Sequence, residues 1–233
     1  MKPVAIITGT GSGIGKGIAK LLLQKNYLVY GYSRNNQIKN QNFRFKKIDL
    51  SKITSVLNLE LPEITSKKVL LINNAATIGE IVPLDLKNDT DIITEYNLNL
   101  IAPTILCRKF ITKYSKVEKL IINISSGAAN NSSESWSTYC ATKAALDMLS
   151  KVISDESHPK LTTFSIHPGI VNTNMQKKIR GAKYKHFPLI NKFKKYHTNN
   201  ELADIDTVAK KLYYIIQNFK RIQPTILSIR DID

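Results

Sequence analysis

Cysteine is nearly absent from this chain of 233 residues, which contains only Cys107 and Cys140. Two cysteines without metal-ligand spacing exclude a disulfide framework and a zinc-type centre, so we expect no metal site. Long hydrophobic runs are also missing, because no apolar stretch approaches the roughly 20 residues of a membrane helix. The N-terminal stretch MKPVAIITGTGSGIG is interrupted by glycines and lacks the form of a signal peptide. These absences predict a cytoplasmic protein with no membrane partner.

Arginine is scarce, although the chain is strongly basic. Only six of its 34 basic residues are arginine, and the formal net charge is +16. The lysines are scattered over the whole length and no nucleic-acid-binding motif accompanies them, so we expect no nucleic-acid partner. The densest basic segment is 177–195, KKIRGAKYKHFPLINKFKK. This segment either binds an anion or forms a solvated, basic lid.

Short apolar runs alternate with amphipathic segments along the whole chain. The β-branched runs predict strands at 4–8, 28–32, 43–48, 69–73, 120–125, 162–167 and 224–229. Helical spacing predicts helices at 14–25, 51–58, 90–115, 137–156 and 204–219. Such alternation, with strands that are apolar throughout, is typical of a parallel sheet covered on both faces. We therefore expect an α/β fold, in which residues 1–233 form a single-domain, Rossmann-type, doubly wound parallel sheet flanked by helices.

The first predicted strand runs directly into the glycine-rich sequence TGTGSGIGKGIAKLLLQ. Gly9, Gly13 and Gly15 are spaced T-G-x-x-x-G-x-G between this strand and a predicted helix. Glycine permits positive φ and a close approach of the ligand, and the following helix N-terminus favours a phosphate. A purely structural bend is the alternative. The position directly after the first strand favours a dinucleotide-binding loop.

No carboxylate stands at the end of the second predicted strand, where GYSRNN is found instead. An acidic residue there would bind the free ribose 2′-hydroxyl of NAD. Ser33 and Arg34 offer a hydroxyl and a forked cationic donor, which suit the 2′-phosphate of NADP. The alternative for Arg34 is an ordinary surface position. The pattern predicts NADP(H) as the cofactor.

The stretch WSTYCATKAALDM at 136–148 places Tyr139 and Lys143 four residues apart on one face of a predicted helix. A phenol has an ordinary pKa of about 10. A nearby ammonium favours the phenolate, so we expect Lys143 to lower the pKa of Tyr139. Most apolar residues of this helix serve packing. The pair itself is a candidate for proton transfer.

The glycine loop, the Tyr139–Lys143 pair and NNAA at 73–76 together resemble the short-chain dehydrogenase/reductase family over nearly the whole chain. The sequence is most similar to the branch of benzil reductases and sepiapterin reductases. The resemblance implies NADPH-dependent reduction of a small carbonyl substrate, namely a ketone of a dicarbonyl or pterin-like compound. An NADP-dependent alcohol or hydroxysteroid-type dehydrogenase is the alternative enzyme. A sensor or scaffold that binds NADP(H) without turnover is the alternative outside catalysis.

The resemblance also implies roles for the catalytic residues. Tyr139 acts as the general acid, and Lys143 assists it and binds the nicotinamide ribose. The family places its catalytic serine thirteen positions before the tyrosine, which is Ser126, while the neighbouring Ser125 is structural. NLNLIAP at 97–103 contains the family asparagine, which holds a water that links the lysine to solvent. Asn99 matches better than the alternative, Asn97.

Further cofactor contacts follow from the same resemblance. It implies contacts from Ser12, Ile14, Asp49, Asn74, Val171 and Thr173. The Ile14 backbone lies near the pyrophosphate, and Asp49 accepts from the adenine amino group unless it only caps a helix. Asn74 lines the adenine ribose, and the Val171 backbone with the Thr173 hydroxyl holds the nicotinamide carboxamide. Ala76 departs from the family pattern, which has glycine there.

Specificity and assembly are expected from two further regions. The segment 174–200 corresponds to the variable substrate lid of the family, with Phe187 and Phe193 as candidate wall residues. Trp136 either borders an aromatic substrate or packs under its helix. Family members commonly associate through their two long central helices, here 96–115 and 137–156. A homo-oligomer, either a dimer or a tetramer, is therefore expected.

Overall fold

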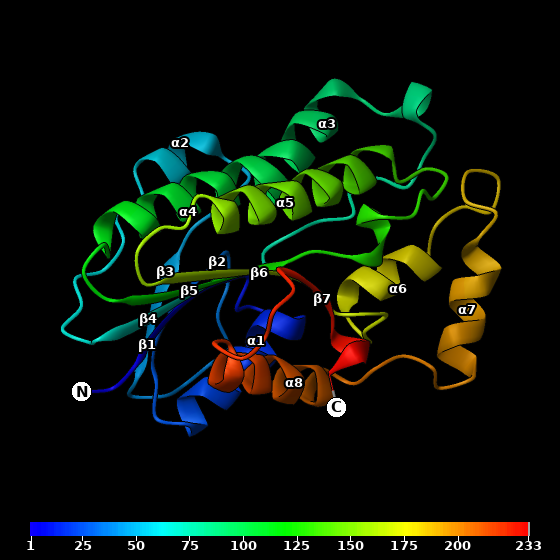
Figure 1. Ribbon diagram of the computed structural model, residues 1–233. Coiled ribbons are helices and arrows are strands. Elements are labelled where there is room, and N and C mark those ends of the chain that lie inside the picture. The colour runs from blue at the N-terminus through cyan, green and yellow to red at the C-terminus, as the bar shows by residue number, and fades with distance from the viewer. Residues whose placement is uncertain (233) are drawn as a thin grey trace.

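A computed structural model describes residues 1–232 of the chain and has the layered α/β fold seen in Figure 1. Seven parallel strands form one sheet in the order β3-β2-β1-β4-β5-β6-β7. The strands are β1 Val4–Thr8, β2 Leu28–Ser33, β3 Phe43–Lys47, β4 Lys68–Asn73, β5 Glu118–Ile124, β6 Leu161–His167 and β7 Ile226–Ser228. Each lies where an apolar run predicted it, so the doubly wound parallel sheet is confirmed.

Helices cover both faces of this sheet (Figure 1). The helices are α1 Gly13–Gln24, α2 Ile53–Leu57, α3 Asp89–Tyr96, α4 Ala102–Lys113, α5 Ser137–Asp155, α6 Asn174–Arg180, α7 Ile190–Thr198 and α8 Ile205–Asn218. Helices α1 and α8 pack on one face, while α2, α4 and α5 pack on the other. Every residue of β1 is buried as a result. This double cover explains why the central strands read as continuous apolar runs.

The helix predicted at 90–115 is not one regular helix. A π-helical turn, Asn97–Ile101, joins α3 to α4. Pro103 lies at the start of α4 and has no N–H to donate to the carbonyl of Asn99, four residues earlier. The proline ring also crowds that carbonyl in a regular α-helix. The chain therefore widens by one residue at this point, as helices often do at functional sites.

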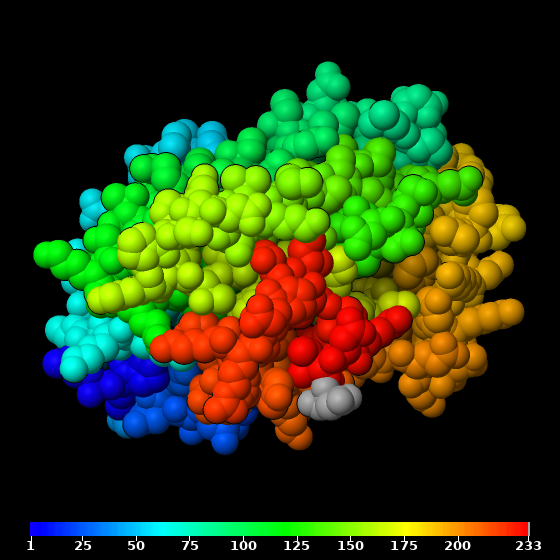
Figure 2. Space-filling model, in the orientation of Figure 1, coloured from blue at the N-terminus to red at the C-terminus, as the bar shows by residue number. Residues whose placement is uncertain are grey.

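The 174–200 segment contains two helices, α6 and α7, that the sequence did not predict. In Figure 2 this segment, in yellow and gold, forms one end of the molecule. Its apolar side chains Ile179, Phe187 and Ile190 are buried against the start of α5. Within residues 1–232, no helix has the length and apolar character that crossing a membrane requires.

The order of the strands determines where a ligand can bind. The chain passes from β1 outward through β2 and β3, and then returns to the other side of β1 with β4. In such sheets the crevice outside the carboxyl ends of the strands, where the winding reverses, is the usual ligand site. The turns after β1, β4, β5 and β6 all meet at this edge, and they carry six of the predicted site residues: Gly9, Ser12, Asn74, Ser126, Val171 and Thr173.

Candidate active site

The turn between β1 and α1 allows a ligand to approach the backbone closely. Gly9 and Gly13 have φ angles of +75° and +55°, which L side chains rarely adopt. A side chain at Gly15 would overlap the carbonyl of Gly9, so this position also requires glycine. Ser12 is the N-cap of α1, and its side chain makes no capping bond. The first turn of α1 therefore presents backbone N–H groups that can bind an anion.

The turn after β4 is fastened to this glycine loop. The Thr8 hydroxyl oxygen accepts hydrogen bonds from the backbone N–H groups of Asn74 at 2.9 Å and Ala75 at 3.0 Å. The Asn74 side-chain amide donates to the carbonyl oxygen of Thr8 at 3.0 Å. Ala76 follows directly, and its methyl group does not disturb these bonds. Thr8 thus fixes two turns relative to each other.

A cleft of about 510 Å³, which we call the main cleft, opens at this edge of the sheet. Most of the predicted cofactor residues line it: Gly9, Ser12, Gly13, Ile14, Ser33, Arg34, Asp49, Asn74, Tyr139, Lys143 and Thr173. The predicted residues that are not among its lining residues are Gly15, Asn99, Ser126 and Val171. The fold therefore brings together residues from segments that are far apart in the sequence.

The end of β2 presents one cationic side chain to the main cleft. Arg34 is exposed. A hydrogen bond from the Ser51 hydroxyl at 2.7 Å keeps the pKa of Asp49 below its ordinary value, and the Arg34 guanidinium lowers it further. The Ser33 hydroxyl donates to the carbonyl oxygen of Asn35 at 2.6 Å, so its proton is already used. Of the two residues predicted to bind a 2′-phosphate, Arg34 is the one with donors to offer.

The segment after β6 contains Val171 and Thr173, the two residues predicted to hold the nicotinamide carboxamide. Val171 forms an isolated bridge with Ala203, and the bonds of this bridge use the carbonyl of Ile170 and the N–H of Asn172. The N–H and carbonyl of Val171 itself take no part in the bridge. Thr173 is the N-cap of α6 and lines the main cleft. The contacts of Val171 and Thr173 with a nicotinamide carboxamide stay a prediction.

The main cleft fits a nicotinamide dinucleotide. Its lining runs from Arg34 and Asp49, beside β2, past the glycine loop to Tyr139 and Lys143 in α5. The glycine loop packs directly on the turn after β4, since a Cβ added at Gly9 would lie 2.6 Å from the Asn74 amide nitrogen. Backbone N–H donors that can bind a pyrophosphate therefore line the same cleft as Arg34 and Tyr139.

Tyr139 lies in the first turn of α5 and is 6% exposed. Burial raises the pKa of its phenol to about 12, although a hydrogen bond with Ser126 acts in the opposite direction. The expectation that Lys143 lowers this pKa is therefore wrong for this structure, because desolvation of the phenolate dominates. The phenol holds its proton at neutral pH, as a proton donor must.

Lys143 lies one turn further along α5, with its Nζ 5.8 Å from the centre of the Tyr139 ring. Its ammonium donates to the carbonyl oxygen of Ile124, at the end of β5, at 2.7 Å. Burial lowers the pKa of Lys143 to about 8, although the Asp147 carboxylate acts to raise it. The lysine thus titrates close to neutral pH, which is unusual for this residue type.

Asp147 continues the series of Tyr139 and Lys143 at a spacing of four residues, and sequence reasoning missed it. Its carboxylate accepts from the Ser165 hydroxyl at 2.5 Å and pairs with the His167 ring at 2.8 Å. Burial acts to raise the pKa of Asp147, but these hydrogen bonds outweigh it and hold the pKa below its ordinary value. The spacing of four residues indicates that the Asp147 carboxylate lies on the same face of α5 as Lys143.

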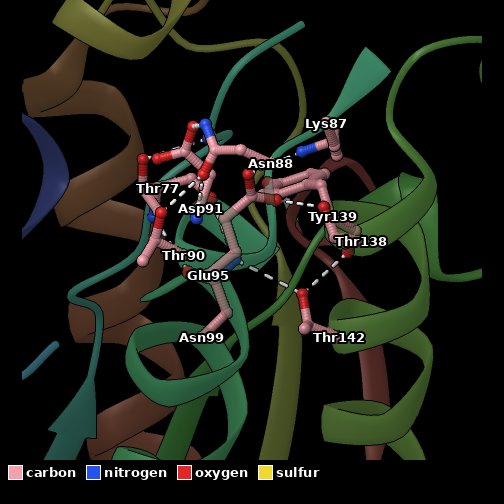
Figure 3. Close-up of polar contacts among 11 residues, drawn as sticks. Thr77, Lys87, Asn88, Thr90, Asp91, Glu95, Asn99, Thr138, Tyr139 and Thr142 are labelled. Atoms are coloured by element: carbon pink, nitrogen blue, oxygen red, sulfur yellow. Dashed lines mark hydrogen bonds and ion pairs between the residues drawn. The ribbon is translucent and has the colours of Figure 1, made fainter. Parts of the chain in front are cut away.

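Asn99 is 1% exposed and lies in the π-helical turn. Its amide bonds both backbone groups of Thr77, with its oxygen accepting from the N–H and its nitrogen donating to the carbonyl, each at 2.9 Å. The nitrogen also donates to Thr142 on α5 at 3.3 Å (Figure 3). The alternative, Asn97, donates to the Ser51 carbonyl instead. A cavity of about 10 Å³, which suits one water molecule, is lined by Asn99 and Lys143.

Trp136 packs between α5 and the 174–200 segment. Its ring stacks on Phe187 with centroids 5.5 Å apart, and it also contacts Phe193 at 5.4 Å. Its ring meets Tyr139 edge-on at 5.9 Å. Trp136 and Phe187 are 7% and 0% exposed, so they form an aromatic core under the segment rather than the wall of a cleft. Of the two alternatives for Trp136, the structure supports packing.

The basic residues at 177–195 lie mostly at the surface. Between Glu156 and Glu201 the sequence contains no acidic residue that could pair with them. Lys178 differs from its neighbours because it lines the main cleft. Anion binding by this segment therefore stays a prediction that concerns Lys178 first.

Residues 3–183 match the family described as short chain dehydrogenase. Benzil reductase ((S)-benzoin forming) from Bacillus cereus is 32% identical to this chain, over 96% of this chain and 98% of that protein. Sepiapterin reductase from Rattus norvegicus is 32% identical over 71% of this chain and 64% of that protein. The chain is thus similar to both enzymes at the same level of identity, and the likeness to the benzil reductase extends over more of the chain.

Solved structures show the same fold. A short-chain dehydrogenase/reductase from Saccharomyces cerevisiae superposes with a TM-score of 0.86 over 99% of this chain and 97% of its own, at 22% identity. 4-Hydroxyisoleucine dehydrogenase complexed with NADH superposes with a TM-score of 0.82 over 97% and 96% of the two chains, at 26% identity. The second of these relatives holds NADH, so the fold alone does not decide between the two dinucleotides.

Proposed function

We propose that this chain, which belongs to the short-chain dehydrogenase family, is an NADPH-dependent carbonyl reductase. Its substrate would be a ketone of a dicarbonyl or pterin-like compound. As a family member it is an oxidoreductase that acts on CH–OH and C=O groups. The observation that carries the proposal is a buried phenol, Tyr139, which bonds Ser126 and lies one helical turn from Lys143 at the end of the main cleft.

The main cleft would hold NADPH, which supplies a hydride when bound. Tyr139 donates its proton to the carbonyl oxygen as negative charge develops there. Ser126 hydrogen-bonds the same oxygen and orients it. Lys143 binds the nicotinamide ribose and places its positive charge near the phenol. A water in the cavity beside Asn99 would then return a proton toward Lys143 and Tyr139.

The dependence of kcat/KM on pH is expected to reflect the Asp147 carboxylate, which lies one helical turn from Lys143. Replacing Asp147 by asparagine removes the carboxylate that supports the ammonium, so the pKa of Lys143 falls below its present value of about 8. We expect the alkaline limb of the profile of kcat/KM against pH to move to lower pH by roughly one unit. Ser165→Ala, which leaves the carboxylate in place, is the matched control. An unmoved limb in Asp147→Asn would refute the support of Lys143 by this charge.

The choice of NADPH over NADH rests on Arg34. Replacing Arg34 by aspartate removes the forked donor and places a carboxylate where NAD-dependent enzymes have one. We expect the ratio of kcat/KM for NADPH to that for NADH to fall by at least about 10-fold, because a hydrogen bond to a charged group contributes roughly 1.5–3 kcal/mol. Arg221→Asp, an equal charge change at an exposed position elsewhere, should leave the ratio unchanged. An unchanged ratio in Arg34→Asp would exclude this role.

The substrate class rests on similarity to the benzil and sepiapterin reductases. The direct test is the oxidation of NADPH with benzil, other diketones, sepiapterin and simple aldehydes, each compared at equal concentration. Preference for a dicarbonyl or for sepiapterin supports the proposal. Preference for a simple alcohol or a hydroxysteroid in the reverse direction would instead favour the alternative dehydrogenase. Tight NADPH binding without any turnover would favour a sensor or scaffold.

Three further features belong to this proposal. We propose that the 174–200 segment, which is continuous with the rest of the domain 1–233, acts as the substrate lid. Exposed apolar side chains on the outer faces of the central helices, Met148 and Val152 on α5 and Ile101 beside α4, suit a homo-oligomer. Both cysteines are free, which suits the reducing cytoplasm.

A further inference from the structure

A fully buried ion pair lies beside the candidate acid, and the mechanism does not use it. Lys87 Nζ lies 2.6 Å from Glu95 Oε1, and the two side chains are 0% and 1% exposed. The other carboxylate oxygen of Glu95 accepts a hydrogen bond from the Thr138 hydroxyl. We call Lys87, Glu95 and Thr138 the Glu95 network. Figure 3 shows it next to Tyr139.

The Glu95 network joins three segments that are distant in the sequence. Lys87 lies in the loop between β4 and α3, Glu95 lies in the last turn of α3, and Thr138 lies in the first turn of α5. Thr138 directly precedes Tyr139 in the chain. The carboxylate therefore connects the backbone that carries the phenol to the helix that leads to Asn99.

The loop after β4 also passes directly over this carboxylate. Gly79 has a φ of +65°, and a Cβ added there would overlap the Glu95 carboxylate. On either side of Gly79, Ile78 and Ile81 pack in the same buried cluster as Tyr139. Ile78 also lines the main cleft. The Glu95 carboxylate thus limits how closely the Gly79 loop can approach α3, and this loop packs against Tyr139.

Stability alone does not explain why a charged pair occupies this place. Removing two charges from water is costly, and well-packed apolar residues in place of a buried ion pair are often neutral or stabilising. An apolar pair could not accept the directed hydrogen bond from Thr138. Catalysis, by contrast, is sensitive to the geometry of the acid, since a misplacement of about 1 Å can cost roughly 100-fold in rate.

We propose that Glu95, neutralised by Lys87, is a positioning residue that fixes Tyr139 through the hydroxyl of Thr138. The inference rests on the proposed function, because it takes Tyr139 as the acid. It assigns no contact with substrate or cofactor to the Glu95 network. The network acts by holding the first turn of α5 and the Gly79 loop in one arrangement.

The test removes the hydrogen bond while keeping the shape of the side chain. Thr138→Val is expected to lower kcat for carbonyl reduction by about 10-fold, with the Kd for NADPH within about twofold of the wild type. Thr138→Ser restores the hydroxyl and is expected to recover most of kcat. Thr163→Val, which removes a buried hydroxyl in β6 that has no partner within residues 1–232, controls for the loss of a hydroxyl as such.

A second pair of variants tests the carboxylate side independently of Thr138. Two double variants are compared, Lys87→Met/Glu95→Gln and Lys87→Met/Glu95→Met. Neither carries a charge at positions 87 and 95, and their side chains are similar in volume, but only the glutamine version keeps an acceptor for the Thr138 hydroxyl. We expect kcat of the glutamine version to exceed that of the methionine version by about 10-fold. Comparable Tm values for the two would show that the difference is not one of folding.

The outcomes separate this inference from the proposed function. Absence of wild-type turnover with every carbonyl tested overturns both. Wild-type turnover that is lost in Tyr139→Phe but unchanged in Thr138→Val overturns the positioning role alone. Equal losses in Thr138→Val and Thr138→Ser, equal kcat in the two double variants, or a Thr138→Val chain that does not fold would assign the network to packing and overturn it as well.

Discussion

Tyr139→Phe is expected to lower kcat for carbonyl reduction by roughly 1,000-fold, within the range that a general acid contributes. The substitution removes only the hydroxyl, and the ring keeps its edge-on contact with Trp136. Because the pKa of the phenol is raised to about 12, the wild-type residue carries its proton throughout the neutral range and can donate it. The variant has no proton to give to the developing alkoxide.

NADPH binding separates this effect from a damaged fold. Tyr139→Phe leaves the glycine loop and Arg34 unchanged, so the Kd for NADPH should stay within about twofold. Fluorescence titration of NADPH and the Tm of the variant provide these controls. Turnover within tenfold of the wild type would exclude Tyr139 as the acid and would leave only its packing role in α5.

Lys143→Met is expected to lower kcat/KM by roughly 1,000-fold, and unlike Tyr139→Phe it should also weaken NADPH binding. Lys143 is 2% exposed, so methionine can occupy its site without a charge. The substitution removes the cation beside the phenol and the proposed donor to the nicotinamide ribose, so that both rate and affinity depend on it. The interaction with the Ile124 carbonyl is lost at the same time.

The dependence of kcat/KM on pH provides a second test of the role of Lys143. Its pKa of about 8 means that the ammonium is present at neutral pH and is lost as the pH rises through 8. Wild-type kcat/KM should therefore decline above about pH 8, and this limb should be absent from the residual activity of Lys143→Met. A variant that retains the same alkaline limb would show that another group is responsible for it.

Much of the fold could be predicted from the sequence because its signals are local. Every residue of β1 is apolar or a small threonine, and it is buried on both faces of the sheet, so the run itself predicts a central strand. The glycine loop is equally local, since Gly9 and Gly13 adopt the positive φ that glycine permits. The spacing of Tyr139 and Lys143 also required only the period of a helix.

The remainder of the site depends on contacts between distant segments. Lys87 follows a short turn in a loop, and nothing near it in the sequence indicates that it pairs with Glu95. The burial of Trp136 needs the aromatic rings of the 174–200 segment, which is folded back from elsewhere. The direction of the pKa shift of Tyr139 likewise follows from burial, and burial is a property of the assembled fold.

Two features of the site, the widened turn at Asn99 and the carboxylate near Lys143, are indicated by residue spacing in the sequence. Pro103 stands four residues after Asn99, and the loss of that helical hydrogen bond predicts a widened turn at the asparagine. Asp147 stands four residues after Lys143, which places a carboxylate on the same face of α5. Both rules follow from helix geometry alone.

The central claim is that the chain transfers a hydride from NADPH to a carbonyl carbon with Tyr139 as the proton donor. The most direct measurement follows NADPH deuterated at the transferable position and analyses the alcohol formed from benzil by mass spectrometry and NMR. We expect one deuterium on the new carbinol carbon with the wild type and a nearly complete loss of this product with Tyr139→Phe. Oxidation of NADPH without deuterium in the product, or equal product from Tyr139→Phe, would contradict it.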